Sequence, residues 1–399
     1  MLKLKILMQL YNSLTRKIEP FKTLQEGIVT MYVCGITPYD ITHLGHAFTY
    51  VFFDVLLRYL KFKGYKVTYV QNITDIDDDI LKKAKEVKKN WQDLGNFWTK
   101  RYLQDMHSLN VLPPTRLIKA TDSIDKIIQI IKSLLKKGAA YQRNGNIYFQ
   151  IKKFPTYGKL SRCNRREMLI LSQERGGNPQ DPLKIDPLDF ILWQESKKDE
   201  PSWNSPWGKG RPGWHIECSA MIHQYLGSKR SRTIDIHGGG RDLIYPHHES
   251  EIAQSESYTV ESPFVNFWMH TCMVLFQGEK MAKSLGNLIM VKDLLKKYSP
   301  NTIRWLLLSH RYRSPWEFTQ DNLGQIENKV KLIETTIRLR ESAKVKEDGD
   351  NLKKFQAIME EDLNTPKALD FLLKLARKKS AKDLKKLYSL LGFRKDFQL

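Results

Sequence analysis

The feature that most constrains the fold is a strand, a helix and a second strand predicted in succession between residues 28 and 73. Residues 28–36 (IVTMYVCGI) are rich in β-branched and aromatic residues, which favour a strand. From His46 onward apolar residues recur at helical spacing, and Gly64 predicts the end of that helix. Residues 66–73 (KVTYVQNI) predict the second strand. Such a unit is the first half of a doubly wound sheet, so we expect an α/β fold with a parallel sheet.

The rest of the chain predicts an interrupted α/β domain followed by helices. A charged helical region is expected at 75–140, and Asn144-Gly145 predicts the turn of a hairpin. Residues 155–212 are rich in Pro, Gly and Trp and predict an irregular insertion that crosses the active site. Residues 233–246 are expected to form a strand, a glycine loop and a short strand. Residues 264–276 are expected to form a pair of strands, and residues 291–312 two helices. Amphipathic helices, interrupted at 344–350, are expected from Asn322 onward.

Composition narrows the class of protein. No run of about 18 apolar residues occurs, so no membrane span is expected, and the basic N-terminus lacks the pattern of a signal peptide. Four scattered cysteines are too few for a disulfide framework and indicate a reduced, cytoplasmic chain. The formal net charge is +21, and residues 321–399 hold 18 basic and 13 acidic residues, so most of the excess precedes them. A tRNA partner would explain this excess, and so would a genome that favours lysine codons.

Two short motifs predict a nucleotide site. His43-Leu-Gly-His46 stands at a predicted helix start, where imidazoles and free N–H groups can hold phosphate oxygens and Gly45 leaves room for a purine. Lys280-Met-Ala-Lys283-Ser284 follows a predicted strand, and its two lysines could neutralise a leaving pyrophosphate. Each motif alone has an ordinary explanation, either a helix start with incidental histidines or a solvated loop. Their occurrence in one chain favours a site for ATP.

Four residues could bind one zinc ion. His247 and Glu251 are four apart behind a proline, which places both side chains on one face of a predicted helix. Cys34 ends the first strand and Cys218 lies in the sequence WHIEC; zinc accepts thiolate, imidazole and carboxylate ligands together. His248 is expected to face elsewhere. The alternative is two buried cysteines and a surface His/Glu pair, because no Cys-x-x-Cys knuckle is present.

A glycine-rich loop follows another predicted strand. The sequence His237-Gly-Gly-Gly-Arg-Asp242 could let a substrate approach the backbone closely, and Asp242 could pair with a substrate ammonium group. The loop matches neither a Walker loop nor a dinucleotide fingerprint, and a plain tight turn is the alternative.

Taken together, these motifs resemble those of the class I cysteinyl-tRNA synthetases over nearly the whole chain, from YNSLTRKIEPF to DLNTPKAL. HLGH is similar to the family's HIGH element and KMAKS to KMSKS, with Ala282 in place of the usual serine. The resemblance implies a Rossmann-like catalytic domain, a zinc ion that binds the substrate thiolate, and ATP with Mg²⁺. The implied zinc ligands are Cys34, Cys218, His247 and Glu251. The implied cysteine pocket contains Thr74, Trp214, His237 and Asp242. The implied catalytic groups on ATP are His43, His46, Lys280 and Lys283, beside Gly45.

The acceptor of the activated cysteine is the open point. We expect residues 1–320 to form the catalytic domain, with a connective insertion at about 100–212. Residues 321–399 are expected to be a truncated helical domain without an anticodon-binding domain. The stretch 174–189 (ERGGNPQDPLKIDPLD) also resembles the ligases of mycothiol synthesis, which join cysteine to glucosaminyl-inositol. The basic charge favours tRNA-Cys, and the intact histidines and lysines disfavour a non-catalytic paralogue. We therefore expect a monomeric cysteine–tRNA ligase.

Overall fold

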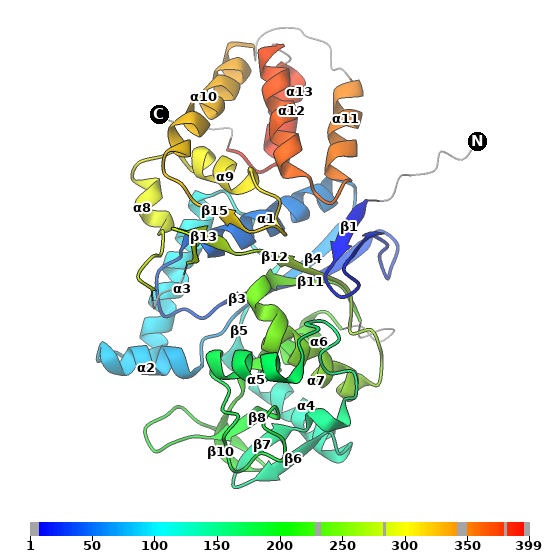
Figure 1. Cartoon of the computed structure of the whole chain (residues 1–399), viewed down its shortest axis with the longest axis vertical. Helices are drawn as coiled ribbons and strands as arrows, with labels where there is room; N and C mark the ends of the chain where they lie inside the picture. The colour runs from blue at the N-terminus through cyan, green and yellow to red at the C-terminus, as the bar shows by residue number, and fades with distance from the viewer. Residues whose placement is uncertain (1–7, 228–232, 282–284, 341–348, 379–380, 395–399) are drawn as a thin grey trace, which may run out of the picture.

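A parallel sheet of five strands forms the centre of the computed structural model (Figure 1). The structure describes residues 8–227, 233–281, 285–340, 349–378 and 381–394. The strand order is β12-β11-β3-β4-β5, and all neighbouring pairs are parallel. The strands span Val265–Thr271 (β12), Ile234–Gly240 (β11), Ile28–Ile36 (β3), Lys66–Ile73 (β4) and Arg116–Lys119 (β5). The chain order reverses between β3 and β11, and ligands bind doubly wound sheets at the carboxyl ends of strands at such a point.

Helix α1 (Leu44–Phe62) links β3 to β4 and confirms the predicted strand–helix–strand unit. It is buried along most of its length, because the sheet lies on one side and further helices lie on the other. The helix begins two residues before His46, since Leu44 is itself buried and belongs to the first turn. It ends just before Gly64, whose φ of 90° suits glycine.

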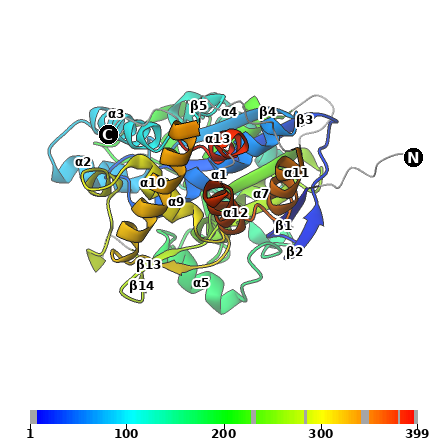
Figure 2. The same cartoon turned by 90° about the horizontal axis from the view of Figure 1, so that it is seen from above.

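The C-terminal helices cover α1 on the side away from the sheet, as the view from above shows (Figure 2). They are α8 (Val291–Leu295), α9 (Pro300–Leu308), α10 (Asn322–Arg340), α11 (Gly349–Met359), α12 (Thr365–Arg377) and α13 (Ala381–Leu390). Arg304 of α9 is fully buried, pairs with Asp54 of α1 and donates to the carbonyl oxygen of Leu391 at 2.7 Å. This contact docks the last helices onto α1. Most of the predicted interruption at 344–350 lies outside the described residues.

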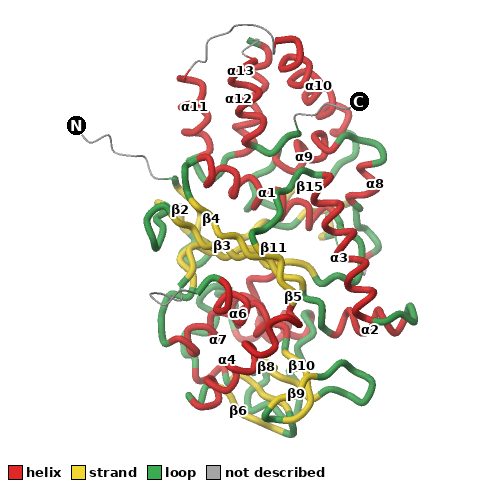
Figure 3. The backbone as a smooth tube through the Cα atoms, turned by 180° about the vertical axis from the view of Figure 1, so that it is seen from behind, coloured by secondary structure: helices red, strands yellow, loops and turns green. Residues whose placement is uncertain are grey.

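Helices and a second sheet lie on the opposite face (Figure 3). The helices are α2 (Asp78–Glu86), α4 (Ile124–Lys136), α5 (Arg165–Glu174), α6 (Trp214–Tyr225) and α7 (Glu249–Thr259). Helix α3 (Trp91–Ser108) runs past the edge of the central sheet (Figure 3), and its Tyr102 and Met106 pack in the same cluster as α1. The second sheet is antiparallel and contains β6 (Ala140–Arg143), β7 (Asn146–Phe149), β8 (Phe190–Glu195), β10 (Gly208–Pro212) and β9 (Trp203–Ser205). The Asn144-Gly145 hairpin is confirmed. The prediction of an irregular 155–212 segment is wrong, because α5 and three of these strands lie there.

The predicted glycine loop is also wrong in part. Gly238–Gly240 continue strand β11, and helical turns at Arg241–Leu243 and Ile244–His248 replace the short strand. A Cβ atom on Gly238 would lie 2.1 Å from the ring of Phe53 in α1. This glycine therefore allows the close approach of helix and sheet.

Among the described residues, no helix is long and apolar enough to cross a membrane.

Two small sheets complete the described structure. One is the hairpin of β1 (Gln9–Asn12) and β2 (Lys17–Pro20). The other joins β13 (Val274–Phe276) to β14 (Glu279–Lys280) and β15 (Trp316–Glu317). Strand β14 of this three-stranded sheet contains Lys280, the first residue of the KMAKS motif.

Candidate active site and metal centre

The expected ligands and pocket residues meet at the carboxyl ends of the parallel strands. Cys34 lies near the end of β3, and His237 lies on β11 across the point where the strand order reverses. Cys218 is on α6, and Glu251 is in the first turn of α7. A Cβ on Gly239 would lie 2.9 Å from Cδ1 of Leu243 and 3.3 Å from Cε1 of His248, so a glycine in this strand lets both side chains pack against it.

The four expected ligands form a compact, buried quartet. The Sγ atoms of Cys34 and Cys218 are 3.9 Å apart. Nε2 of His247 lies 3.4 Å from Cys218 Sγ and 3.1 Å from Oε1 of Glu251. Cys34 Sγ lies 3.9 Å from the same carboxylate oxygen. All four residues are at most 5% exposed, and their ligand atoms lie within 4.8 Å of one another.

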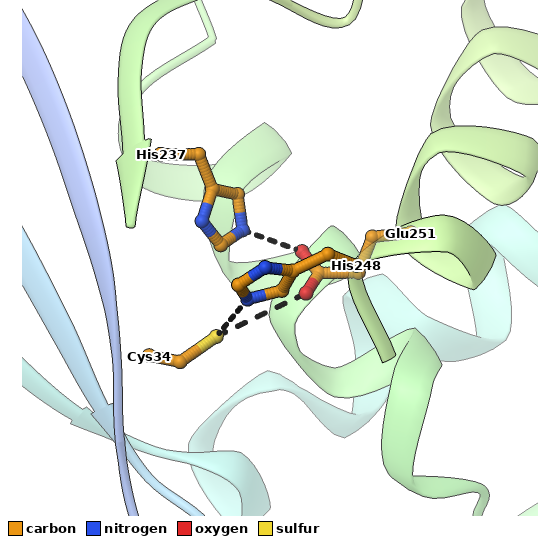
Figure 4. Close-up of side chains that lie close together, drawn as sticks. All are labelled: Cys34, His237, His248 and Glu251. Atoms are coloured by element: carbon orange, nitrogen blue, oxygen red, sulfur yellow. Dashed lines mark hydrogen bonds and ion pairs between the residues drawn. The ribbon is translucent and has the colours of Figure 1, made fainter. Parts of the chain in front are cut away.

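A second set of potential ligands overlaps the quartet and shares Cys34 and Glu251 with it (Figure 4). Its other members are His237, whose Nε2 lies 2.8 Å from Glu251 Oε2, and His248, whose Nε2 lies 3.3 Å from Cys34 Sγ. The prediction that His248 faces elsewhere is therefore wrong. His248 and Glu251 are three residues apart at the start of α7, and this spacing places both side chains on one helix face, as the spacing of four does for His247 and Glu251.

Burial controls the charge of this cluster. It lowers the pKa of His237 to about 3, and it lowers the pKa of His247 and His248 well below the usual range. It also raises the pKa of Cys34 and of Glu251 well above their usual values. Without a cation, burial disfavours every charged form. A divalent cation would compensate two thiolates and a carboxylate, so the donor set suits a metal.

Two of the four expected pocket residues, Trp214 and His237, contact the quartet. Trp214 begins α6 and stacks on the ring of His247 with centroids 4.3 Å apart. Thr74 is buried after β4, where its Oγ1 accepts from Asn72 Nδ2 at 3.0 Å. Asp242 is half-buried after β11, and its backbone oxygen accepts from Arg175 of the insertion.

The expected nucleotide residues meet at the N-terminus of α1. His43 is the N-cap, and its Nδ1 accepts from the N–H of Gly45 at 3.1 Å. The rings of His43 and His46 stack with centroids 3.7 Å apart. Burial lowers the pKa of His43 to about 4, with Asp242 opposing and Lys280 adding to the shift. Both rings are thus neutral at pH 7, since burial also lowers the pKa of His46 well below its usual value.

The KMAKS segment returns to this helix start. Lys280 is exposed on β14, while Lys283 and Ala282 lie outside the described residues. After the segment, Met290 bridges to His43, and the N–H of Leu44 donates to the carbonyl oxygen of Ile289 at 2.8 Å. Backbone hydrogen bonds therefore join the start of α1 to the segment that follows the KMAKS motif.

Sequence reasoning missed several polar residues behind the quartet. Nδ1 of His215 lies 3.0 Å from Nδ1 of His247. His248 Nδ1 lies 2.8 Å from Nε2 of His270, whose Nδ1 lies 2.8 Å from the hydroxyl of Ser13. The available signal was an extra histidine beside an expected ligand in each of two segments, His215 in WHIEC and His248 in PHHESE.

Comparison with known proteins agrees with this geometry. Residues 20–328 match the family described as the tRNA synthetases class I (C) catalytic domain. A cysteine--tRNA ligase of Legionella pneumophila (strain Corby) is 46% identical over 399 residues, covering 97% of this chain and 85% of that protein. One from Trichodesmium erythraeum (strain IMS101) is 44% identical over 388 residues, covering 93% and 78%.

A solved structure supports the fold alone. Mycobacterium tuberculosis methionyl-tRNA synthetase in complex with methionyl-adenylate aligns with a TM-score of 0.64 at 14% identity, covering 92% of this chain and 89% of that one. The family match, the identity to curated relatives and the shared architecture lead to one conclusion. The chain belongs to the cysteine--tRNA ligases, a family of class I aminoacyl-tRNA synthetases.

Proposed function

We propose that this chain activates L-cysteine with ATP to cysteinyl-adenylate and transfers the cysteine to tRNA-Cys, with one zinc ion selecting the substrate thiol. The observation that carries the proposal is the buried Cys34–Cys218–His247–Glu251 quartet at the end of β3. After β3 the chain leads directly to the start of α1, where the expected nucleotide residues lie. When bound, zinc supplies a centre that prefers a thiolate to a hydroxyl, so serine is rejected without editing.

The distances within the quartet fit tetrahedral zinc. With Zn–S near 2.3 Å and Zn–N and Zn–O near 2.0 Å, tetrahedral edges run from about 3.3 Å for N···O to about 3.8 Å for S···S. The corresponding separations are 3.1 Å between His247 and Glu251 and 3.9 Å between Cys34 and Cys218. In the overlapping set, His237 contacts the other carboxylate oxygen of Glu251, Oε2, at 2.8 Å, and this hydrogen bond leaves Oε1 for the metal. With the ligand set that the family resemblance implies, we assign His237 and His248 to the outer shell.

The roles on ATP follow from charge and position. His43 and His46 present neutral imidazoles beside the N-terminus of α1, where backbone N–H groups favour phosphate. Lys280 and Lys283 neutralise the leaving pyrophosphate, with Mg²⁺ as the companion ion. No general base is required, because the attacking carboxylate of cysteine is already ionised at pH 7. Asp242, Thr74 and Trp214 would hold the rest of the amino acid.

The acceptor is tRNA-Cys in this proposal. The curated relatives named above are cysteine--tRNA ligases, so an amino-sugar acceptor is not favoured. The net charge of +21 supports a polyanionic partner. A monomeric state, a cytoplasmic location and the division near residue 320 stay predictions.

Acceptor-dependent AMP release tests the function. Wild-type protein with cysteine and ATP should release AMP with tRNA-Cys and not with glucosaminyl-inositol. Cys218→Ser should lower zinc content and raise the KM for cysteine far more than the KM for ATP. Cys163→Ser is the matched control, because this half-buried thiol lies outside both ligand sets and should change neither constant. Turnover with the sugar alone would overturn the assigned acceptor.

A further inference from the structure

The turn between α11 and α12 holds a buried carboxylate that the proposed reaction does not use. Asp362 is only 1% exposed. Its Oδ1 accepts from the hydroxyl of Tyr312 at 2.7 Å and from the N–H of Tyr11 at 2.9 Å. Its Oδ2 accepts from Nε of Arg313 at 2.7 Å. One side chain thus joins the C-terminal helices to strand β1 and to the segment before β15.

The backbone of this turn is held in a costly conformation. Asp362 and Leu363 have φ values of 52° and 48°, in the left-handed region that residues other than glycine seldom adopt. The N–H of Asp362 also donates to the carbonyl oxygen of Gln9 at 3.1 Å. Such strain persists only where surrounding contacts fix the conformation, and it is often found where function requires it. The contacts of Asp362 are the ones that fix this turn.

Tyr312 links the carboxylate to the catalytic domain. It is 2% exposed, and its ring stacks on Phe52 of α1 with centroids 4.0 Å apart. Its backbone oxygen accepts from the N–H of Cys272, two residues before β13, at 2.6 Å. A single residue held by Asp362 therefore contacts both the helix that begins at the HLGH motif and the chain that leads into the KMAKS motif.

The segment after Tyr312 continues along the strands that carry the first KMAKS lysine. The N–H of Phe318 donates to the carbonyl oxygen of Leu275 on β13 at 2.8 Å. Leu275 in turn pairs with Lys280 on β14, and β13 also pairs with β15. Figure 1 shows β13 and β15 beside α1, below the C-terminal helices. Hydrogen bonds and strand pairing thus connect the C-terminal helices to Lys280.

We propose that Asp362 is a positioning residue for adenylate formation, because it fixes Tyr312 and thereby the β13–β14 hairpin that presents Lys280 to the pyrophosphate. The inference rests on the role of Lys280 in the proposed function. A misplacement of about 1 Å that starts far from the reacting atoms can slow an enzyme by about 100-fold. Since Lys280 acts on the leaving group in the transition state, loss of the anchor should lower kcat and leave the KM values for ATP and cysteine nearly unchanged.

Asp362→Asn tests the assignment. Asparagine keeps the shape of the side chain and tolerates left-handed backbone, but it replaces one acceptor oxygen with an amide donor. We expect kcat of cysteine-dependent ATP–pyrophosphate exchange to fall by about 10- to 100-fold, with zinc content unchanged. Tyr312→Phe, which removes only the hydroxyl, should cause a smaller fall of the same kind. Exchange would be measured at a temperature where circular dichroism shows every variant to be folded.

Asp189→Asn is the matched control. Asp189 lies in the insertion and is also 1% exposed. Its carboxylate accepts from the hydroxyl of Tyr141 and from the N–H of Ile151, both at 2.9 Å. Both asparagine variants should lower the midpoint of urea unfolding, but only Asp362→Asn should slow exchange. Exchange at the wild-type rate in Asp362→Asn, or an equal fall in both variants, would refute the inference.

A double-mutant cycle separates this inference from the role of Lys280. If Asp362 acts through Lys280, adding Asp362→Asn to Lys280→Ala should slow exchange further by less than about threefold, because the two changes remove one interaction. Two effects that multiply in full would refute the path through Lys280. If Lys280→Ala alone exchanges at the wild-type rate, the proposed role of Lys280 fails first, and Asp362 loses its role with it.

Discussion

Gly35→Ala should damage the metal centre through the sheet without removing any ligand. Gly35 follows Cys34 on β3, and a Cβ built on it would lie 1.6 Å from the carbonyl oxygen of Asn72 on β4. Ordinary contact begins near 3.4 Å, so the strands must separate by about 1.5 to 2 Å at this point. The hydrogen bond from the N–H of Gly35 to Asn72 Oδ1, 2.7 Å long, would also be strained.

A displacement of this size exceeds what a metal site tolerates. Functional geometry must hold within about 0.5 Å, and ligand distances within about 0.2 Å. We therefore expect at least a 100-fold loss of zinc affinity, together with destabilisation of about 1–3 kcal/mol from overpacking. Zinc content by mass spectrometry and urea unfolding measure the two effects. Gly324→Ala is the matched control, because its Cβ meets no atom within 4 Å in α10 and alanine favours a helix. Full zinc occupancy in Gly35→Ala at wild-type affinity would refute the reasoning.

Two further predictions concern the ATP site and acid stability. Lys280→Ala should slow cysteine-dependent ATP–pyrophosphate exchange by about 100-fold or more, because a cation at the leaving group is lost. The control, Lys353→Ala on helix α11, should leave the exchange rate unchanged. Exchange at a near-wild-type rate in Lys280→Ala would contradict the assignment. Burial lowers the pKa of His310 from 6.5 to about 4. Between these pH values the unfolded chain therefore binds one proton more than the folded chain, so the free energy of unfolding falls as the pH drops from 6.5 toward 4. Urea unfolding of His310→Gln at pH 7.5 and pH 5 should show an acid loss smaller than that of wild type by up to about 2 kcal/mol, and an equal loss in both proteins would rule out this origin.

The parts of the fold that local patterns encode were predictable. The unit from β3 to β4 has alternating or helical apolar spacing and clear glycine ends, and it is confirmed. The insertion was not predicted, because β8 pairs with β7, from which it is separated in sequence by helix α5, and local composition does not reveal that partner. Composition near 155–212 reports prolines and glycines but not the partners of such strands.

Some residues of the candidate site could be predicted from the sequence, and others could not. Resemblance to a family supplied Cys34 and Cys218, whose separation in sequence carries no zinc signature. The position of His248 was misjudged, because only the spacing of four between His247 and Glu251 was considered, although the spacing of three also places His248 on the face of Glu251.

X-ray absorption at the zinc edge tests the central claim most directly. For the zinc-loaded protein, coordination by Cys34, Cys218, His247 and Glu251 predicts two sulfurs at about 2.3 Å and two nitrogen or oxygen ligands at about 2.0 Å. Addition of L-cysteine should bring a further sulfur into the shell, whereas L-serine should not. A shell with one sulfur and three nitrogen or oxygen ligands would instead indicate the set with His237 and His248 and would contradict the account.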